Sequence, residues 1–275
     1  MVERAVLEIE TRAFRAWPAD EVEPLGGWAL RAAGGLTRRA NSVWPGPDAP
    51  AAPALDAGAL AARIARVERF YASRRLAPRF QLFPAAAPAD LDAELARRGW
   101  IVEAPVSVQV ADAARVAQAG DGRELPVSLA HAPTAGWWSV AGERSRSAGA
   151  EPRFRALLGR LAGRVGYALV ERAGEPVAAG LGVVDEGWLG VFSMSTRPAH
   201  RRRGAARAVL AALAGFALER GAPRIYLQVE RDNAPALALY ARAGFAEHHG
   251  YHYRTHPAGA AAGRLRVALR PRPPG

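Results

Sequence analysis

The sequence of 275 residues contains no cysteine and no lysine. The lack of cysteine excludes disulfides, thiolate metal sites and cysteine nucleophiles. The lack of lysine excludes Walker-type phosphate loops and Schiff-base chemistry on a lysine. All 37 basic residues are therefore arginine, and against 26 acidic residues they give a formal net charge of +11.

Long hydrophobic runs are also missing, since no apolar stretch approaches the ~20 residues that a membrane span requires. The first residues, M-V-E-R-A-V-L-E-I-E, carry charge too early for a secretory signal. The positive charge is scattered and no aromatic residues alternate with the arginines, so we expect no specific nucleic acid and no membrane as partner. Arginine in place of lysine is typical of a GC-rich genome. We therefore expect a soluble cytoplasmic protein from a bacterium.

A loop-like stretch, Q-A-G-D-G-R-E, divides the chain near its middle. We expect one domain over residues 1–117, a linker over 118–124, a second domain over 125–256 and a partly disordered Arg/Pro-rich tail over 257–275. In the second domain, three consecutive hairpin strands precede a strand–helix–strand–helix–strand series. This order predicts an α/β (α+β) fold with a mixed central sheet flanked by helices.

The segment from Met194 to Ala206 is the most informative part of the sequence. A strand there leads through a glycine-bearing turn into a helix, whose first N–H groups are unpaired and attract anions. Arg201, Arg202 and Arg203 crowd this helix start, where the helix dipole alone would favour acidic residues. The turn therefore predicts a polyanion site; a solvated arginine run in an arginine-rich chain is the alternative.

Two patterns in register support the first interpretation. Pro198, Arg201, Gly204 and Ala206 fit the pattern Q/R-x-x-G-x-G/A, and D-N-A-P-A-L-A-L-Y-A-R-A-G-F (Asp232 to Phe245) fits N-x-x-A-x-x-x-Y-x-x-x-G-F. With these residues the chain resembles the GNAT superfamily of acetyl-CoA-dependent N-acetyltransferases. The resemblance implies the GNAT fold and acetyl-CoA as co-substrate, with no metal.

The resemblance also assigns a cofactor site. Gly204 would let the backbone approach the pyrophosphate, and successive N–H groups would donate to it. Met194 and Thr196 would pair their backbone groups with the pantetheine arm, and an N–H there would polarise the thioester carbonyl. The expected cofactor-binding residues are Met194, Ser195, Thr196, Arg201, Arg202, Arg203, Gly204, Ala205, Ala206 and Asn233.

The expected catalytic residues are Tyr240 and Glu230. In the family the tyrosine protonates the departing thiolate, which suits a phenol of pKa ~10 beside a thiol of pKa ~8.5; a core aromatic is the alternative. Glu230 is the first candidate for the general base and Asp232 the second, with a surface charge as the alternative for both. Three histidines at 248, 249 and 252 fall on an expected terminal hairpin, where partly exposed side chains are favoured over a metal site.

The first half of the chain resembles a damaged copy of the second. Leu95-Ala-Arg-Arg-Gly99-Trp100 mirrors Tyr240-Ala-Arg-Ala-Gly244-Phe245, and Val43-Trp44-Pro45 mirrors Thr196-Arg197-Pro198. Leu95 stands in place of Tyr240 and Asp48 in place of Arg201, among prolines at 47, 50 and 53 that have no N–H to donate. Chance similarity between two α/β segments is the alternative. The hairpin expected over Trp28 to Trp44 also carries polar residues for an acceptor pocket or a solvated face: Arg31, Arg38, Arg39 and Asn41.

The sequence thus predicts a tandem GNAT protein, monomeric or homodimeric, with an inert first half and an active second half. The active half would acetylate a primary amine of a small molecule or peptide. A tandem acetyltransferase like mycothiol synthase is one alternative. A CoA-responsive binding module without turnover is another, although such a module would not require the phenol of Tyr240.

Overall fold

The computed structural model describes residues 2–46, 56–86, 88–119, 125–142, 150–161 and 163–258. The chain forms two compact units, and neither is continuous in sequence. Unit 1 combines Met1–Leu7, Ala19–Pro105 and Tyr251–Gly275, and unit 2 combines Glu8–Pro18 with Val106–Gly250. The expected linker and tail fall largely outside the described residues, as do Asp48 and the prolines beside it, so the domain division at 118–124 stays a prediction.

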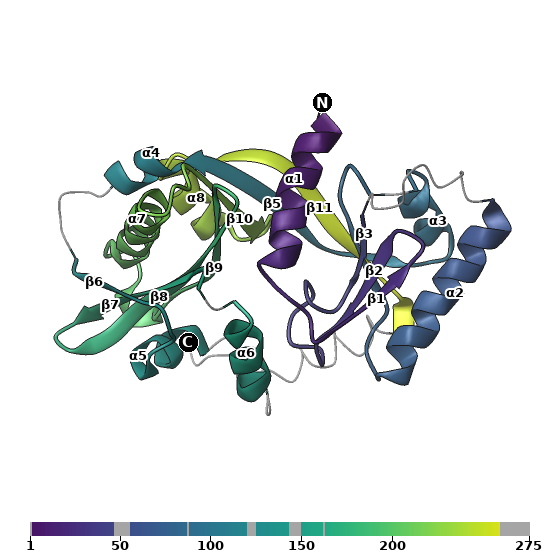
Figure 1. Cartoon of the computed structure of the whole chain (residues 1–275), viewed down its shortest axis with the longest axis horizontal. Coiled ribbons are helices and arrows are strands. Elements are labelled where there is room, and N and C mark those ends of the chain that lie inside the picture. Colours follow the sequence, from purple (N-terminus) through teal and green to yellow (C-terminus); the bar gives the residue numbers. More distant parts are fainter. Residues whose placement is uncertain are drawn as a thin grey trace. The chain divides into compact units, whose positions relative to one another are not determined.

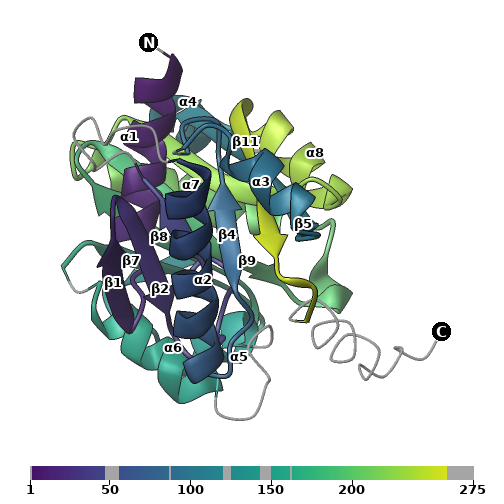
Figure 2. The ribbon, with the colours of Figure 1, turned by 90° about the vertical axis from the view of Figure 1, so that its right-hand side faces the viewer.

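In unit 1 a sheet packs against one long helix, α2 (Figures 1 and 2). Strands β1, β2 and β3 pair antiparallel in sequence order, and β3 then pairs parallel with β4. Apolar residues of β2 and β4, such as Leu30 and Phe80, are buried with Ile64 and Tyr71 of α2. The elements are α1 (Val2–Arg15, shared with unit 2), β1 (Glu21–Leu25), β2 (Trp28–Ala32), β3 (Val43–Pro45), α2 (Ala57–Ser73), β4 (Arg79–Leu82) and α3 (Leu91–Arg97).

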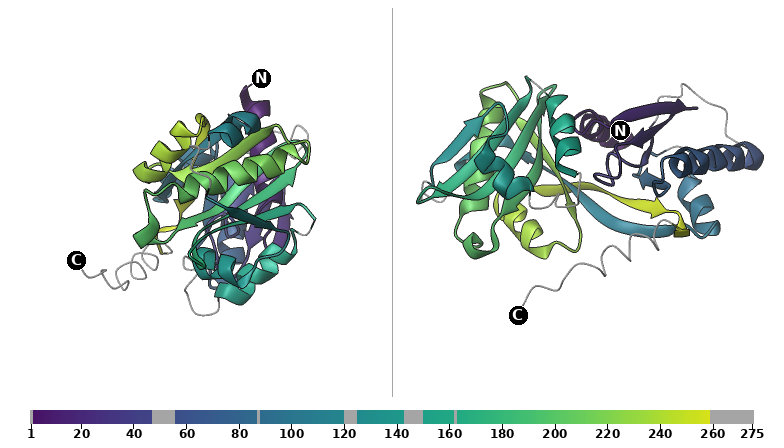
Figure 3. Two further views of the ribbon diagram at one scale, coloured as in Figure 1. Left: turned by 90° about the vertical axis from the view of Figure 1, so that its left-hand side faces the viewer. Right: turned by 90° about the horizontal axis from the view of Figure 1, so that it is seen from below.

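Unit 2 repeats this plan at larger scale. Strands β6 to β9 form an antiparallel meander, and β9 pairs parallel with β10. Helix α7 packs with α4 on one face of the sheet, and α5 packs on β8 on the other (Figure 3). The elements are α4 (Ala113–Gln118), β6 (Val127–Ala130), α5 (Ala135–Ala141), α6 (Ala150–Gly159), β7 (Val165–Arg172), β8 (Glu175–Asp185), β9 (Trp188–Thr196), the 3₁₀ helix η2 (Pro198–His200), α7 (Ala205–Leu218), β10 (Arg224–Glu230) and α8 (Ala234–Arg242).

The last strand of each half completes the sheet of the other unit. Residues Val106 to Asp112 of β5 (Ile101–Asp112) pair antiparallel with β10 in unit 2. Residues His252 to Thr255 of β11 (Ala246–Thr255) pair antiparallel with β4 in unit 1. Within the described residues, both units therefore contain antiparallel pairs, one parallel pair and an exchanged last strand, which agrees with the predicted repeat.

Two local predictions were wrong. In the hairpin expected over Trp28 to Trp44, residues 36–42 form a loop, because the buried Asn41 side chain accepts the N–H groups of Ala33 (2.8 Å) and Gly35 (2.9 Å) and so competes with strand pairing. Arg31 is also buried, so neither it nor Asn41 lies on a solvated face. The expected terminal hairpin is a single strand, β11, because Gly250 continues the strand instead of turning it.

Candidate active site

The parallel pair β9 and β10 opens before either strand ends. Their last paired residues are Val191 and Leu227, although β9 continues to Thr196 and β10 to Glu230. Parallel strands point their carboxyl ends to one edge, so the starts of α7 and α8 follow at the same edge. Open α/β sheets bind ligands outside the carboxyl ends of their strands.

A β-bulge lies in β9 at the opening. The pairing of β9 with β8 shifts between Ala179 and Leu181, so that Gly180 on β8 faces both Ser193 and Met194 on β9. Ser193 has a φ of 51°, the left-handed region that a non-glycine residue rarely adopts. The buried Trp137 of α5 donates its indole N–H to the Gly180 carbonyl (2.9 Å). This hydrogen bond satisfies a carbonyl at the point where the bulge disrupts the ladder.

This bulge was not predicted, although the sequence contains a signal for it. Gly180 and Gly182 interrupt an apolar strand, and an isolated glycine inside a strand often indicates a bulge or a close approach. A Cβ at position 180 would lie 2.6 Å from a Val209 methyl carbon and 2.7 Å from Met194 Sδ. Met194 therefore packs toward α7, and the strand tolerates no side chain at position 180.

The arginine turn has the backbone geometry of an anion site. Gly204 is the N-cap residue of α7 with a φ of 86°, and Arg202 is also left-handed with a φ of 62°. The first N–H groups of α7 that bond within the turn are those of Arg207 and Ala208, both to the Gly204 carbonyl. The N–H groups of Ala205 and Ala206 precede them and have no partner within a helix.

The arginine side chains of this turn are exposed. Arg201, Arg202 and Arg203 all face solvent, and the Arg201 guanidinium donates to the Thr196 carbonyl at the end of β9 (3.4 Å). Ser195 and Thr196 are half-buried and pair with Ala179 and Ala178 of β8. The turn therefore joins the bulged end of β9 to the start of α7.

Helix α8 begins and ends as the sequence predicts. The Asn233 side chain accepts the Ala236 N–H (3.3 Å) as the N-cap, and Pro235 occupies the first turn. Tyr240 is buried in the core that α7 shares with β9 and β10, and its ring contacts Phe245. The residues of the family pattern therefore form a capped helix whose tyrosine lies in the core shared by α7, β9 and β10.

The two candidate bases differ in position. Glu230 is the last residue of β10, lies opposite Val106 of β5 and is exposed. Asp232 is exposed in the turn before α8. Glu230 therefore stands at the open end of the strand pair, and Asp232 lies two residues beyond it.

Of the three histidines expected to be partly exposed, His248 and His252 are, whereas His249 is not. His249 is buried, and its Nε2 lies 2.9 Å from the Oε1 of Glu10, which is also buried. His252 is half-buried and pairs with Asp92 of α3, and His248 is exposed. The prediction was wrong for His249 because α1 covers it. The part of the chain that the structure describes contains no group of three or more potential metal ligands.

Polar contacts of Glu247 link β11 to β5. Ser107 donates its hydroxyl to Glu247 (2.7 Å), and Arg231 donates to the other oxygen of the same carboxylate (2.6 Å). These two hydrogen bonds hold the pKa of Glu247 below its ordinary value. Both contacts lie beside the end of β10, since Ser107 is opposite Val229.

The strand order, the bulged and opened strand pair and the glycine turn together define the GNAT acetyltransferase fold. A family model described as "Probable histone acetyltransferase Rv0428c C-terminal" matches residues 5–254. The chain belongs to this family of GNAT-type acetyltransferases.

Relatives and solved structures agree with this assignment. The uncharacterized N-acetyltransferase YobR of Bacillus subtilis is 28% identical over 255 residues, which cover 90% of this chain and 98% of YobR. A GCN5-related N-acetyltransferase from Kribbella flavida superposes with a TM-score of 0.64 at 17% identity, covering 95% of this chain and 97% of its own. A tandem GNAT protein from the clavulanic acid biosynthesis pathway superposes with a TM-score of 0.58 at 15% identity, covering 76% and 72%. The two structures share the fold with this chain.

No helix within the described residues has the length and apolar character needed to cross a membrane.

Proposed function

We propose that the second half of the chain transfers an acetyl group from acetyl-CoA to a primary amine of a small molecule or a peptide. The observation that carries the proposal is the opened end of β9 and β10, with a bulge on one strand and the glycine turn directly after it. Acetyl-CoA suits this arrangement because it has a pyrophosphate for the turn and an amide-bearing arm for the opened edge of β9.

The turn would hold the pyrophosphate through backbone N–H groups of residues 202–206. The left-handed Gly204 supports this role, because a residue without Cβ permits close approach of a phosphate. The exposed Arg201, Arg202 and Arg203 would add positive charge around it. Asn233 would fix the start of α8 at the same edge.

The reaction proposed is direct attack of the amine on the thioester. The nitrogen lone pair forms a bond to the carbonyl carbon, and the carbon–sulfur bond breaks. The thiolate takes a proton from Tyr240, and the nitrogen gives a proton to Glu230 directly or through water. A backbone N–H of the bulged segment of β9, at Met194 or beyond, would stabilise the negative charge on the carbonyl oxygen. Glu230 then releases its proton to solvent, solvent returns a proton to Tyr240, and the products are an amide and free CoA.

Calorimetry with acetyl-CoA tests the first part of the proposal. Gly204→Glu should abolish binding and leave the fold intact, because it places a charged side chain where the pyrophosphate would lie. Gly221→Glu is the matched control: Gly221 follows α7, also has a positive φ of 67°, and a Cβ added there would meet no other atom within 4 Å. Equal loss of binding in both variants would overturn the assignment of the turn.

Release of free thiol over a panel of amines tests the second part. The panel includes small amines, a mycothiol-type acceptor and lysine-containing histone peptides, since the family description names histones. Tyr240→Phe should lower kcat by about 10²- to 10⁴-fold without changing acetyl-CoA affinity. Tyr167→Phe, which removes the hydroxyl of another buried tyrosine, should leave kcat unchanged.

A CoA-responsive binding module is the second candidate. Acetyl-CoA binding without thiol release for any amine would favour it over the transferase. The presence of a tyrosine at position 240 of the family pattern supports the transferase, because a module that only binds CoA does not require a phenol there.

A further inference from the structure

Phe192 occupies the closed end of the opening in unit 2. It is the first residue of β9 beyond the last pair, Val191 with Leu227. Its ring is buried and packs against Trp17 with a centroid distance of 5.3 Å and against Tyr226 at 6.2 Å. The alternate residues Leu189 and Val191 belong to the core under α7, so these rings lie on the other face of the sheet.

Trp17 reaches this position from the far N-terminal end of the sequence. It follows α1, and its ring also contacts Phe154 of α6 at 5.8 Å. Residues Glu8–Pro18 belong to unit 2, so the ring is part of the same compact unit as the opening.

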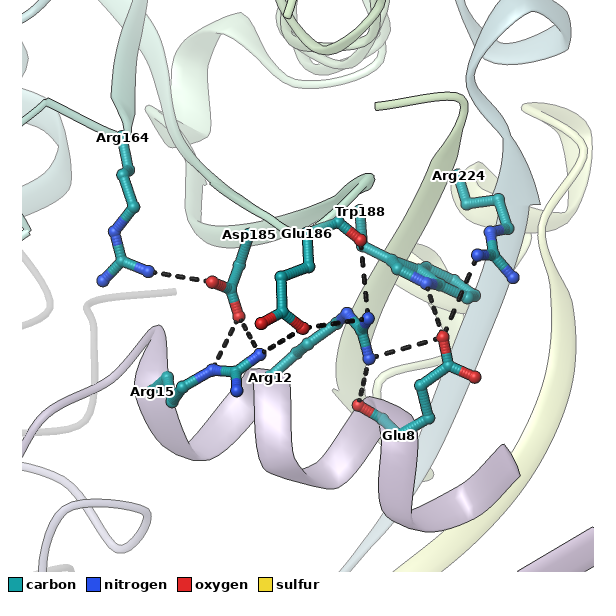
Figure 4. A network of polar contacts seen from close by, with 8 residues as sticks. All are labelled: Glu8, Arg12, Arg15, Arg164, Asp185, Glu186, Trp188 and Arg224. Atoms are coloured by element: carbon teal, nitrogen blue, oxygen red, sulfur yellow. Dashed lines mark hydrogen bonds and ion pairs between the residues drawn. The ribbon is translucent and has the colours of Figure 1, made fainter. Parts of the chain in front are cut away.

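A polar network holds this part of α1 against the sheet (Figure 4). Arg15 binds Asp185 at the end of β8 (2.6 Å), and Arg12 binds Glu186 in the following turn (3.3 Å). One turn earlier, Glu8 accepts the indole N–H of Trp188 (3.2 Å). Three successive polar contacts along α1 leave Trp17 little freedom to move away from Phe192.

We infer that Trp17 and Phe192 close the acyl end of the active site and limit the donor to a two-carbon acyl group. The inference rests on the proposed function, which puts the thioester at the bulge of β9. An acyl chain that extends from there toward the closed end meets the Phe192 ring, with Trp17 packed behind it. An apolar pocket discriminates one methylene by about 10- to 200-fold, so a filled pocket rejects longer acyl groups strongly.

Binding of acyl-CoA esters to the full-length protein tests the inference without a known acceptor. Calorimetry compares CoA, acetyl-CoA, butyryl-CoA and hexanoyl-CoA. The wild-type protein should bind butyryl-CoA at least about tenfold more weakly than acetyl-CoA. Trp17→Leu should reduce this ratio at least about tenfold and leave the affinity for CoA itself unchanged.

Trp138→Leu is the matched control. Trp138 is a buried tryptophan of α5 whose ring contacts Trp137 and Phe154, both at 5.4 Å. The control loses the same side-chain volume from the same aromatic cluster, on the α5 side and away from α1, and should keep the wild-type ratio. If Trp17→Leu does not fold, Trp17→Phe and Phe192→Leu make smaller changes and should shift the ratio in the same direction.

Three results would overturn the inference. Equal binding of acetyl-CoA and butyryl-CoA by the wild-type protein would show that the pocket is not closed. An unchanged ratio in folded Trp17 and Phe192 variants, or an equal change in Trp138→Leu, would show that these two rings do not set it. Failure of the wild-type protein to bind CoA or acetyl-CoA would instead refute the proposed function, and the inference with it.

Discussion

The ion pairs of the Asp185 carboxylate should contribute much of the free energy that holds α1 against the sheet of unit 2. Its side chain is only 10% exposed and accepts from two arginines, Arg15 (2.6 Å) and Arg164 (3.0 Å), which are 37% and 41% exposed (Figure 4). Asp185→Asn keeps the shape of the side chain and removes its charge. The two guanidinium groups would then lose their shared carboxylate.

The expected cost follows from the burial of the three groups. Exposed ion pairs contribute about 0.2–1 kcal/mol, whereas removing one partner of a fully buried pair costs about 3–5 kcal/mol. Here the carboxylate is nearly buried and the arginines are well solvated, so solvent screening reduces the loss to about 2 kcal/mol. For a chain of this size that loss lowers Tm by about 4–8 °C.

Thermal unfolding followed by circular dichroism measures this effect. Glu151→Gln is the control, because Glu151 pairs with Arg155 on the surface of α6 and the two side chains are 60% and 51% exposed. An exposed i,i+4 pair contributes only about 0.2–0.5 kcal/mol. A Tm for Asp185→Asn within about 1 °C of the control would refute the reasoning that this carboxylate anchors α1.

Other parts of unit 2 give further predictions. Gly190→Ala should destabilise the protein in chemical denaturation, because a Cβ there would lie 2.5 Å from the Tyr226 hydroxyl oxygen. Ser107→Ala should reduce stability at neutral pH, since it removes a hydrogen bond that lowers the pKa of Glu247. Because the pKa of Glu247 is lower in the folded state than its unfolded value of ~4.3, the ionised carboxylate stabilises the fold at pH values above ~4.3. The difference in unfolding free energy between the wild-type protein and Ser107→Ala should therefore disappear as the pH falls through the folded-state pKa. Residues 118–275 expressed alone should be unfolded when measured by circular dichroism, because β5, the partner strand of β10, is absent. A cooperative unfolding transition of this fragment would contradict the conclusion that unit 2 requires β5 to complete its sheet.

Local sequence signals predicted the elements of unit 2 well. The dipeptides Ala173-Gly174 and Glu186-Gly187 predict tight hairpins, and both residues of each adopt the positive φ of such turns. The helix starts at Gly204 and Asn233 also follow from local chemistry, since they depend on residues within one turn.

Features that depend on distant residues were not predictable from the sequence. The burial of His249 requires Glu10, which lies 239 positions earlier. The position of Trp17 depends on contacts of α1 with the turn after β8, and no periodicity in either segment indicates that pairing. The loop at Asn41 was missed because it depends on hydrogen bonds from the Ala33 and Gly35 N–H groups to the Asn41 side chain, which the sequence pattern does not indicate.

The exchange of β5 and β11 has a consequence for synthesis on the ribosome. Strand β4 is complete after residue 82, but its partner at His252 to Thr255 emerges some 170 residues later. Until then the nascent chain presents an unpaired strand edge, the kind of surface that pairs with other chains. Unit 2 extends to residue 250, so neither unit can mature before almost the whole chain is made. We therefore expect folding to be largely post-translational, with dependence on chaperones concentrated in the interval before β11 leaves the ribosome.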